Sequence, residues 1–218
     1  MRRFALLAVV AIALPALPTA VRAQACRGGV SFAAVPVRLG GGAVFGKDYM
    51  AYAASLNAGK DNAAFGAVGV SRAYFDDLDD TGDDIFAEFG YQRPVGSRAQ
   101  LCPVVGVAIG TGPEDGGIER SRFASAGLAL GVTLRPTQSI KVIPNGSLRF
   151  EYGSSDFVDE LGDEQTATDN YGVADLGLGL IFFRDRLSIQ PTVQFPIGAE
   201  NSDVSYGIVF SIGFAVKR

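Results

Sequence analysis

One stretch of the sequence has the residue order of a calcium-binding loop. It reads D-x-D-x-T-G from Asp77 to Gly82, and five residues separate Gly82 from a glutamate. Ca²⁺ takes oxygen ligands at alternate positions of such a loop, a glycine for the sharp turn, and a bidentate glutamate at its end. Helices flank an EF-hand, however, and strands are expected here, so a solvated acidic loop is the alternative interpretation. The candidate ligands are Asp77, Asp79, Thr81, Asp83 and Glu88.

Catalytic chemistry has few residues to draw on. The 218 residues include no histidine, which excludes Ser-His and Cys-His nucleophilic catalysis and any histidine metal site. No Ser-Lys or paired-carboxylate constellation is recognisable in the sequence. We therefore expect a protein that is not an enzyme, with no catalytic residue and no cofactor apart from the calcium that the acidic loop would bind.

The N-terminus predicts export. A cationic Met1-Arg2-Arg3 precedes an apolar run from Phe4 to Leu14, and small residues follow near Ala23. These are the parts of a secretory signal peptide, predicted here over residues 1–23. A membrane anchor is the alternative, but the run is well short of the ~20 residues that span a bilayer. In an oxidising compartment Cys26 and Cys102 are expected to form a disulfide, with two free thiols as the alternative.

Alternation of large and small residues dominates the remaining chain. In the last segment Tyr206, Ile208, Phe210, Ile212 and Phe214 share one face of a strand, and mostly Gly, Ser and Ala share the other. A water-facing surface would be rich in charged side chains, whereas small residues suit a crowded lumen. The pattern therefore favours a closed, all-β, up-and-down antiparallel transmembrane barrel with its large side chains on lipid. A soluble secreted barrel that binds a hydrophobic ligand inside is the alternative.

Turn signals divide the mature chain into about ten strands, with eight as the alternative count. Connections that follow them alternate between short and long, as in barrels with short periplasmic turns and longer outer loops. Eighteen of the 23 acidic residues lie in or beside the long-loop set, and only Asp61 and Asp185 lie in the short turns. The predicted strands are 36–45, 49–58, 63–75, 85–94, 101–110, 121–135, 140–154, 171–183, 187–198 and 204–217.

Several charged residues are expected on the lumen face of these strands. Arg149 and Glu151 are two residues apart on one such face. We expect the set to form an ion-pair cluster that fills a narrow lumen, with a selective path for small solutes as the alternative. The candidate lumen charges are Glu88, Arg135, Arg149, Glu151 and Asp175.

On these features the chain resembles the small bacterial outer-membrane β-barrel proteins, which include the porin-like barrels. Such proteins carry an assembly signal in their last strand, which Ser205, Gly207, Phe210 and Ile212 match, although this chain continues past Phe214 to Arg218. The resemblance implies export to the outer membrane of a Gram-negative envelope, and insertion by the outer-membrane assembly machinery. Its implied partners are the lipid bilayer and lipopolysaccharide. It implies no particular activity.

The domains expected are the signal peptide 1–23, a periplasmic arm 24–35 and a barrel 36–218. The formal net charge of −4 argues against binding to nucleic acid, so no nucleic-acid partner is expected. The leading functional hypothesis is a non-enzymatic structural barrel that presents acidic loops outside the cell. A narrow channel or transporter for small solutes is the second hypothesis, and the soluble ligand-binding barrel is the third. The sequence names no solute and no surface ligand.

Overall fold

The computed structural model describes most of the chain from residue 24 onward. The described residues are 24–29, 32, 35–75, 80–112, 118–134, 140–158, 164–183, 185–199 and 203–214. The predicted signal peptide lies outside them. Among the described residues, no helix has the length and apolar character needed to cross a membrane.

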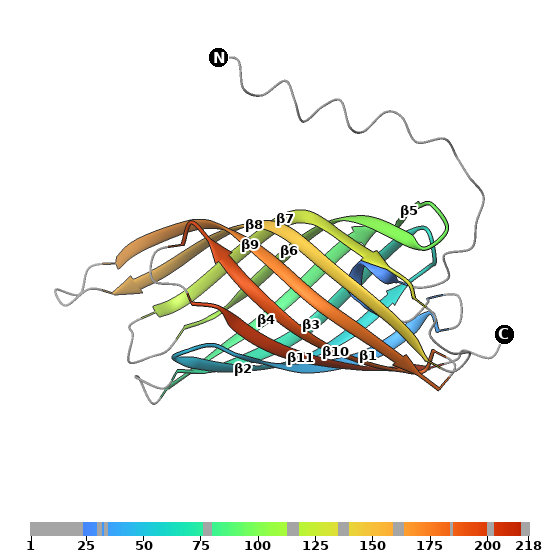
Figure 1. Cartoon of the computed structure of the whole chain (residues 1–218). Coiled ribbons are helices and arrows are strands. Elements are labelled where there is room, and N and C mark those ends of the chain that lie inside the picture. Colours follow the sequence, from blue (N-terminus) through green and yellow to red (C-terminus); the bar gives the residue numbers. More distant parts are fainter. Residues whose placement is uncertain are drawn as a thin grey trace, which may run out of the picture.

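Ten antiparallel strands close into a barrel (Figure 1). β1 pairs with β11, and the other neighbours along the chain pair in turn, except that β4 pairs directly with β6. The short β5 pairs with the beginning of β6. This confirms the predicted all-β closed barrel and the count of ten. A single 3-10 turn, η1 (Ala25–Arg27), precedes the strands. The strands are β1 (Val37–Phe45), β2 (Tyr49–Gly59), β3 (Ala64–Phe75), β4 (Asp80–Tyr91), β5 (Arg93–Val95), β6 (Ala99–Thr111), β7 (Ile118–Val132), β8 (Lys141–Val158), β9 (Glu164–Phe182), β10 (Leu187–Ile197) and β11 (Ser205–Phe214).

Three strands extend beyond their predicted bounds by four residues or more. β4 starts at Asp80 rather than 85, β8 continues to Val158, and β9 starts at Glu164 rather than 171. Residues Gly153 to Val158 of β8 pair with Glu164 to Asp169 of β9, so a hairpin continues above the barrel wall. Side chains in these extensions do not alternate between apolar and small, so the sequence pattern predicts loops there. Backbone pairing needs no such alternation.

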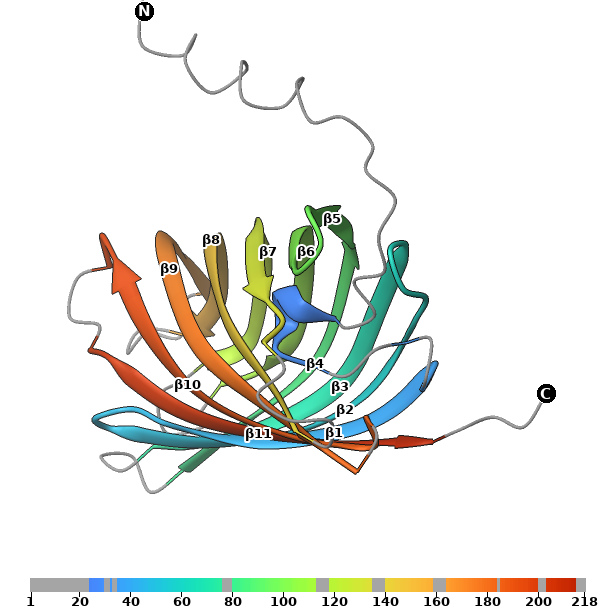
Figure 2. The same cartoon turned by 45° about the vertical axis from the view of Figure 1, so that its right-hand side comes forward.

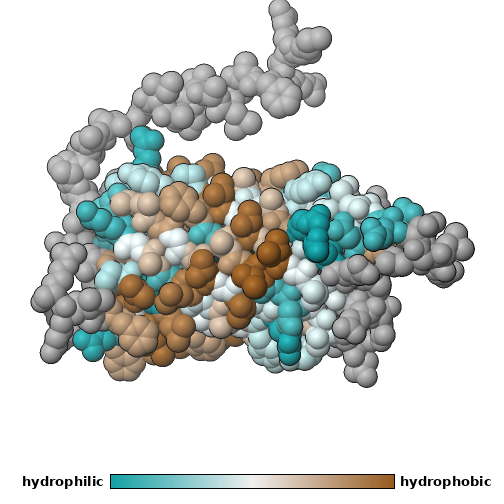
Figure 3. Space-filling view, turned by 180° about the vertical axis from the view of Figure 1, so that it is seen from behind, coloured by the Kyte–Doolittle hydropathy of each residue, from teal (hydrophilic) through white to brown (hydrophobic). Residues whose placement is uncertain are grey.

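The two faces of the barrel wall differ as the alternation predicts. Outward-facing side chains are large, apolar and exposed to the surroundings of the barrel (Figure 3), among them Leu56, Val70, Ile85, Val107, Leu148, Phe150, Leu176 and Ile212. Inward-facing positions are mostly Gly, Ala, Ser and a few larger polar residues. Five of the seven tyrosines also face outward and are exposed: Tyr52, Tyr74, Tyr91, Tyr152 and Tyr206. Tyr49 and Tyr171 alternate to the inner face, so they are not part of an outer aromatic girdle.

The barrel has two distinct ends. The connections from β2 to β3, from β4 to β6, from β7 to β8 and from β9 to β10 share one end, which we call the turn end. The other end, from which the β8–β9 hairpin projects, is the loop end (Figure 1). Segment η1 lies at the turn end, where it is the first described part of the chain (Figure 2).

Candidate functional site

The N-terminal segment fills the turn end of the lumen. We call its described residues, Gln24–Gly29 with Phe32 and Val35, the plug. Figure 2 shows η1 within the curve of the sheet, facing the strands β4 to β7. Ala25 is 0% exposed, and Cys26, Phe32 and Val35 are also buried. Residues 24–35 are the expected periplasmic arm, and its described part lies inside the turn end of the barrel.

A disulfide joins the plug to the barrel wall. Cys26 and Cys102 are bonded, with 6.0 Å between their Cα atoms, which confirms the predicted pair. Cys102 lies on β6, and both cysteines pack with Phe32, Phe65 and Val104 in one buried cluster. The crosslink closes a loop across 76 positions of the chain, for which the chain-entropy model gives about 4–5 kcal/mol of stabilisation.

Hydrogen bonds from the wall satisfy the backbone of the plug. The Ala25 N–H donates to Oε1 of Gln100 on β6 at 2.8 Å, and both groups are buried. The Phe32 N–H donates to Oδ1 of Asp61, in the β2–β3 turn, at 2.7 Å. A buried amide without a partner would be costly, so these side chains favour this placement of the segment.

Arg38 on β1 holds the plug from the opposite wall. Its Nη2 donates to Oε1 of Gln24 at 2.5 Å, and its guanidinium carbon lies 3.9 Å from the centre of the Phe32 ring. Arg38 is only 3% exposed. A guanidinium over an aromatic face is attracted by the ring, most strongly where water is excluded. One arginine thus contacts both ends of the plug.

Two wall glycines give the plug its room. A Cβ at Gly131 on β7 would overlap the carbonyl oxygen of Ala25, and a Cβ at Gly179 on β9 would overlap that of Gly28. Neither glycine has a positive φ, so close approach of the two backbones, rather than backbone conformation, requires them. The glycines of the inner face are therefore fitted to the plug as well as to a narrow lumen.

Four of the five predicted lumen charges do face inward and are ion-paired. Glu88 on β4 binds Arg27 of the plug at 3.0 Å. Arg149 on β8 binds Oδ2 of Asp175 at 3.1 Å and Oε1 of Glu151 at 3.3 Å. Asp175 also accepts hydrogen bonds from Ser147 and from Gln194. The fifth, Arg135, lies outside the described residues.

The two acidic residues in the short turns, Asp61 and Asp185, each bind another part of the chain. Asp61 accepts the Phe32 N–H, as described above. Asp185, in the β9–β10 turn, pairs with Nζ of Lys141 on β8 at 2.5 Å. An acidic residue in a short turn of this barrel therefore indicates a specific contact with the lumen side of the wall or with the plug.

The structure does not bring the candidate calcium ligands together. Thr81 and Asp83 lie on the outer face of β4, where Asp83 binds Arg72 on β3, whereas Glu88 faces the lumen and binds Arg27. Odd and even positions of one strand point to opposite faces. Asp77 and Asp79 lie outside the described residues. Within the described part of the chain, no cluster of three Asp, Glu or Cys side chains could hold a metal ion.

The predicted assembly-signal residues divide between the two faces of β11. Ser205 and Gly207 face inward, and the Ser205 hydroxyl donates to Oε1 of Gln194 at 3.2 Å. Phe210 and Ile212 face outward and are exposed. Their role in assembly stays a prediction.

Comparisons with solved structures return bacterial outer-membrane β-barrels. The likeness is one of fold. The N-terminal β-barrel domain of Pseudomonas aeruginosa OprF is 11% identical, with 82% of this chain and 96% of that one covered and a TM-score of 0.36. LpxR from Salmonella typhimurium is 6% identical, with 81% and 100% covered and a TM-score of 0.45. The β domain of the Bordetella autotransporter BrkA is 12% identical, with 82% and 98% covered and a TM-score of 0.47. No protein-family model and no curated protein matches the sequence.

The site therefore consists of a plug and the wall residues that hold it. The cysteine pair and the inward charges could be recognised from sequence. Gln24, Arg38 and Gln100 were missed, because nothing in the pattern says that a polar residue on a lumen face binds another segment of the chain. The one available signal was Asp61, an acidic residue in a short turn. Chemically, the arrangement obstructs the lumen at the turn end.

Proposed function

We propose that this chain is a non-enzymatic outer-membrane β-barrel that is closed by its own N-terminal plug. Its role is to be a structural component of the envelope and to present the acidic loop end to the exterior. The observation that carries the proposal is the plug, which is disulfide-bonded to β6 and hydrogen-bonded to three parts of the wall.

The outer surface supports insertion into a bilayer. On β8 the outward face stays free of charge from Val142 to Tyr152, about 33 Å along a strand. At a strand tilt of about 40° this corresponds to ~25 Å of height, the size of the apolar band of a membrane barrel. Exposed Tyr152 and Tyr91 lie near opposite ends of the wall, where aromatic rings favour the two interfaces.

The same surface argues against the soluble, ligand-binding alternative. Such a barrel would have an apolar interior and a polar exterior. Here Phe150 and Leu148 are more than half exposed on the outside, while Arg149 and Asp175 pair within the lumen. The narrow-channel alternative requires an open lumen, which the plug opposes.

Lysine labelling on intact cells tests location and orientation together. Lys47 lies in the β1–β2 connection at the loop end and is well exposed, and Lys60 is exposed in the β2–β3 turn. We expect a membrane-impermeant amine reagent to modify Lys47 and to leave Lys60 unmodified until the outer membrane is opened. Lys60 is thus the matched control.

The opposite labelling pattern would overturn the proposed orientation. Recovery of the protein in the periplasmic fraction without detergent would overturn membrane insertion and favour the soluble barrel. We expect the purified protein to migrate differently on a gel before and after boiling, which shows that the barrel in the sample is folded.

A further inference from the structure

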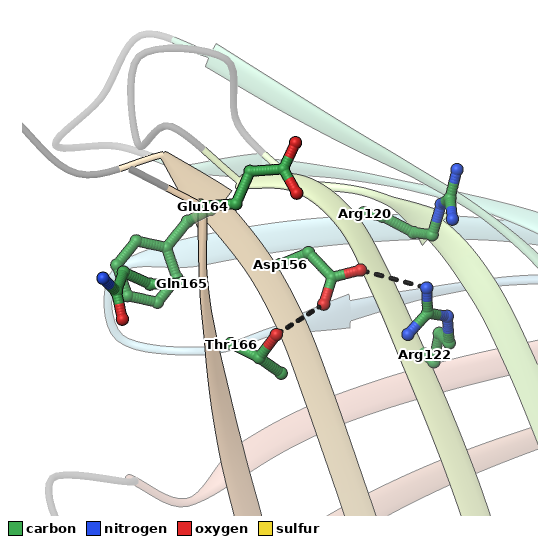
Figure 4. A pocket seen from close by; sticks show the side chains of 7 residues that line it. Arg120, Arg122, Asp156, Glu164, Gln165 and Thr166 are labelled. Carbon is green, nitrogen blue, oxygen red and sulfur yellow. Dashed lines mark hydrogen bonds and ion pairs between the residues drawn. The ribbon is translucent and has the colours of Figure 1, made fainter. Parts of the chain in front are cut away.

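A small cavity lies on the outside of the barrel, just above its apolar band. It has a volume of about 480 Å³ and lies where β7, β8 and β9 run together toward the loop end (Figure 4). Its lining is formed by residues of all three strands: Arg120, Arg122, Asp156, Phe157, Glu164, Gln165 and Thr166. None of them belongs to the plug or to the lumen network.

The position of the cavity follows from the register of the strands. Arg122 lies opposite Ser154 of β8, and Ser154 is the next outward residue beyond the exposed Tyr152. Arg120 lies opposite Asp156, one outward position higher still. The outer face thus passes from aliphatic to aromatic to charged side chains as it leaves the apolar band. Phosphate groups of lipids occupy this level of a membrane surface.

Arg122 is fixed by an ion pair, whereas Arg120 has no ion-pair partner among the residues that the structure describes. Arg122 donates through Nη2 to Oδ2 of Asp156 at 3.0 Å, and Asp156 also accepts the Thr166 hydroxyl at 3.1 Å. Figure 4 shows Arg122 directed at Asp156, with Arg120 standing apart. Arg120 is exposed and makes no ion pair with any described residue. Arginine presents several donors in a planar fork that suits phosphate.

We propose that Arg120 and Arg122 bind the phosphate group of a membrane lipid. Asp156 is the positioning residue, since it orients Arg122 and leaves the other donors of that guanidinium available. Charge complementarity and the place directly above the apolar band point to a lipid phosphate, whose acyl chains would lie along Tyr152 and the residues below it. The proposal rests on the membrane location proposed above. Glu164 also lines the cavity, and its carboxylate opposes an anion.

Lipid binding by charge-removing variants tests the proposal. The probe is diphosphorylated lipid A in mixed micelles with the full mature protein, and binding is read by native mass spectrometry and by titration calorimetry. We expect Arg120→Gln to weaken binding about tenfold, the size of effect that loss of a hydrogen bond to a charged group produces. Arg122→Gln should weaken it similarly, and Glu164→Gln should leave it equal or tighter.

Arg72→Gln is the matched control. Arg72 also faces outward near the loop end, but its Nε and Nη2 donate to the two carboxylate oxygens of Asp83, at 2.6 Å each. Its removal changes the net charge by the same amount, and binding should change less than about twofold. Arg122→Lys is a conservative variant that keeps the positive charge. Heat-dependent gel mobility verifies that every variant is folded.

Three results would overturn the proposal. Equal weakening by Arg72→Gln would mean that net charge alone attracts the lipid. Unchanged binding in folded Arg120→Gln would show that the cavity is not the site. Competition by inorganic phosphate at the same concentration as lipid A would make free phosphate the ligand. Each result is independent of lysine labelling on cells, so failure here and failure of the proposed location can be told apart.

Discussion

Two glycines on the lumen surface are required by the close approach of the plug backbone. Gly131 and Gly179 each face a carbonyl oxygen of the plug, so even one methyl group would displace that segment. By contrast, Gly66 on the outer face has only an ordinary contact, 3.4 Å from the carbonyl oxygen of Glu88 to a built Cβ. The sequence pattern alone does not distinguish the glycines that contact the plug from a glycine such as Gly66.

We expect Gly131→Ala to destabilise the protein by about 1–3 kcal/mol, the usual cost of overpacking a filled site. It should also lower the fraction of molecules with the Cys26–Cys102 bond, because Ala25 precedes Cys26 directly. Urea unfolding in micelles and thiol labelling after refolding measure the two effects. Gly66→Ala is the control and should shift stability by less than about 0.5 kcal/mol. Equal behaviour of the two variants would contradict the fitted plug.

Residue types predicted only part of this site. The cysteine pair was predictable because only two cysteines are present, and inward charges such as Arg149 followed from the alternation. The contact of Arg38 with Gln24 and Phe32 was not predictable. It depends on where a segment without regular structure lies relative to a closed wall, and no periodicity of the sequence encodes that.

At the level of elements, the sequence predicted every strand of the closed ring but not all of their lengths. Alternation marks a strand where its two faces meet different surroundings, here the lumen and the apolar exterior. Beyond Tyr152 both faces of the β8–β9 hairpin are polar, so the signal ends although the ladder continues to Val158 and Glu164. β4 begins at Asp80, five residues before its predicted start at 85, for the same reason.

The projecting hairpin should therefore be dispensable for the barrel. Replacing residues 155–167 by a two-residue Asn-Gly turn keeps the pair of Ser154 with Thr168. It removes the outer pairs of β8 with β9 and three pairs of β8 with β7. We expect the shortened protein to fold and to show heat-dependent gel mobility, with a melting temperature within a few degrees of the parent. The same replacement removes Asp156 and with it the proposed lipid site. Failure of this variant to form a barrel would contradict the division between wall and hairpin.

At the scale of the whole molecule, the barrel and its polarity were predictable, whereas its closure by the N-terminus was not. Alternation, turn lengths and charge sorting all describe the wall. The arm 24–35 has no pattern of its own beyond Cys26, and the sequence allowed a tether at the rim. Burial of Ala25, Phe32 and Val35 within the lumen became visible only when the wall residues around them were placed.

Ion conductance across a planar bilayer tests the closed barrel most directly. The oxidised, folded protein is inserted, and current is recorded before and after a reductant is added, with Cys26→Ser as the variant that never forms the bond. We predict no conductance steps from the oxidised wild type. We predict openings after reduction or in Cys26→Ser, where the plug is retained by noncovalent contacts such as the Arg27–Glu88 pair. Stable conductance steps from the oxidised wild type would contradict the closed barrel and make the protein a channel.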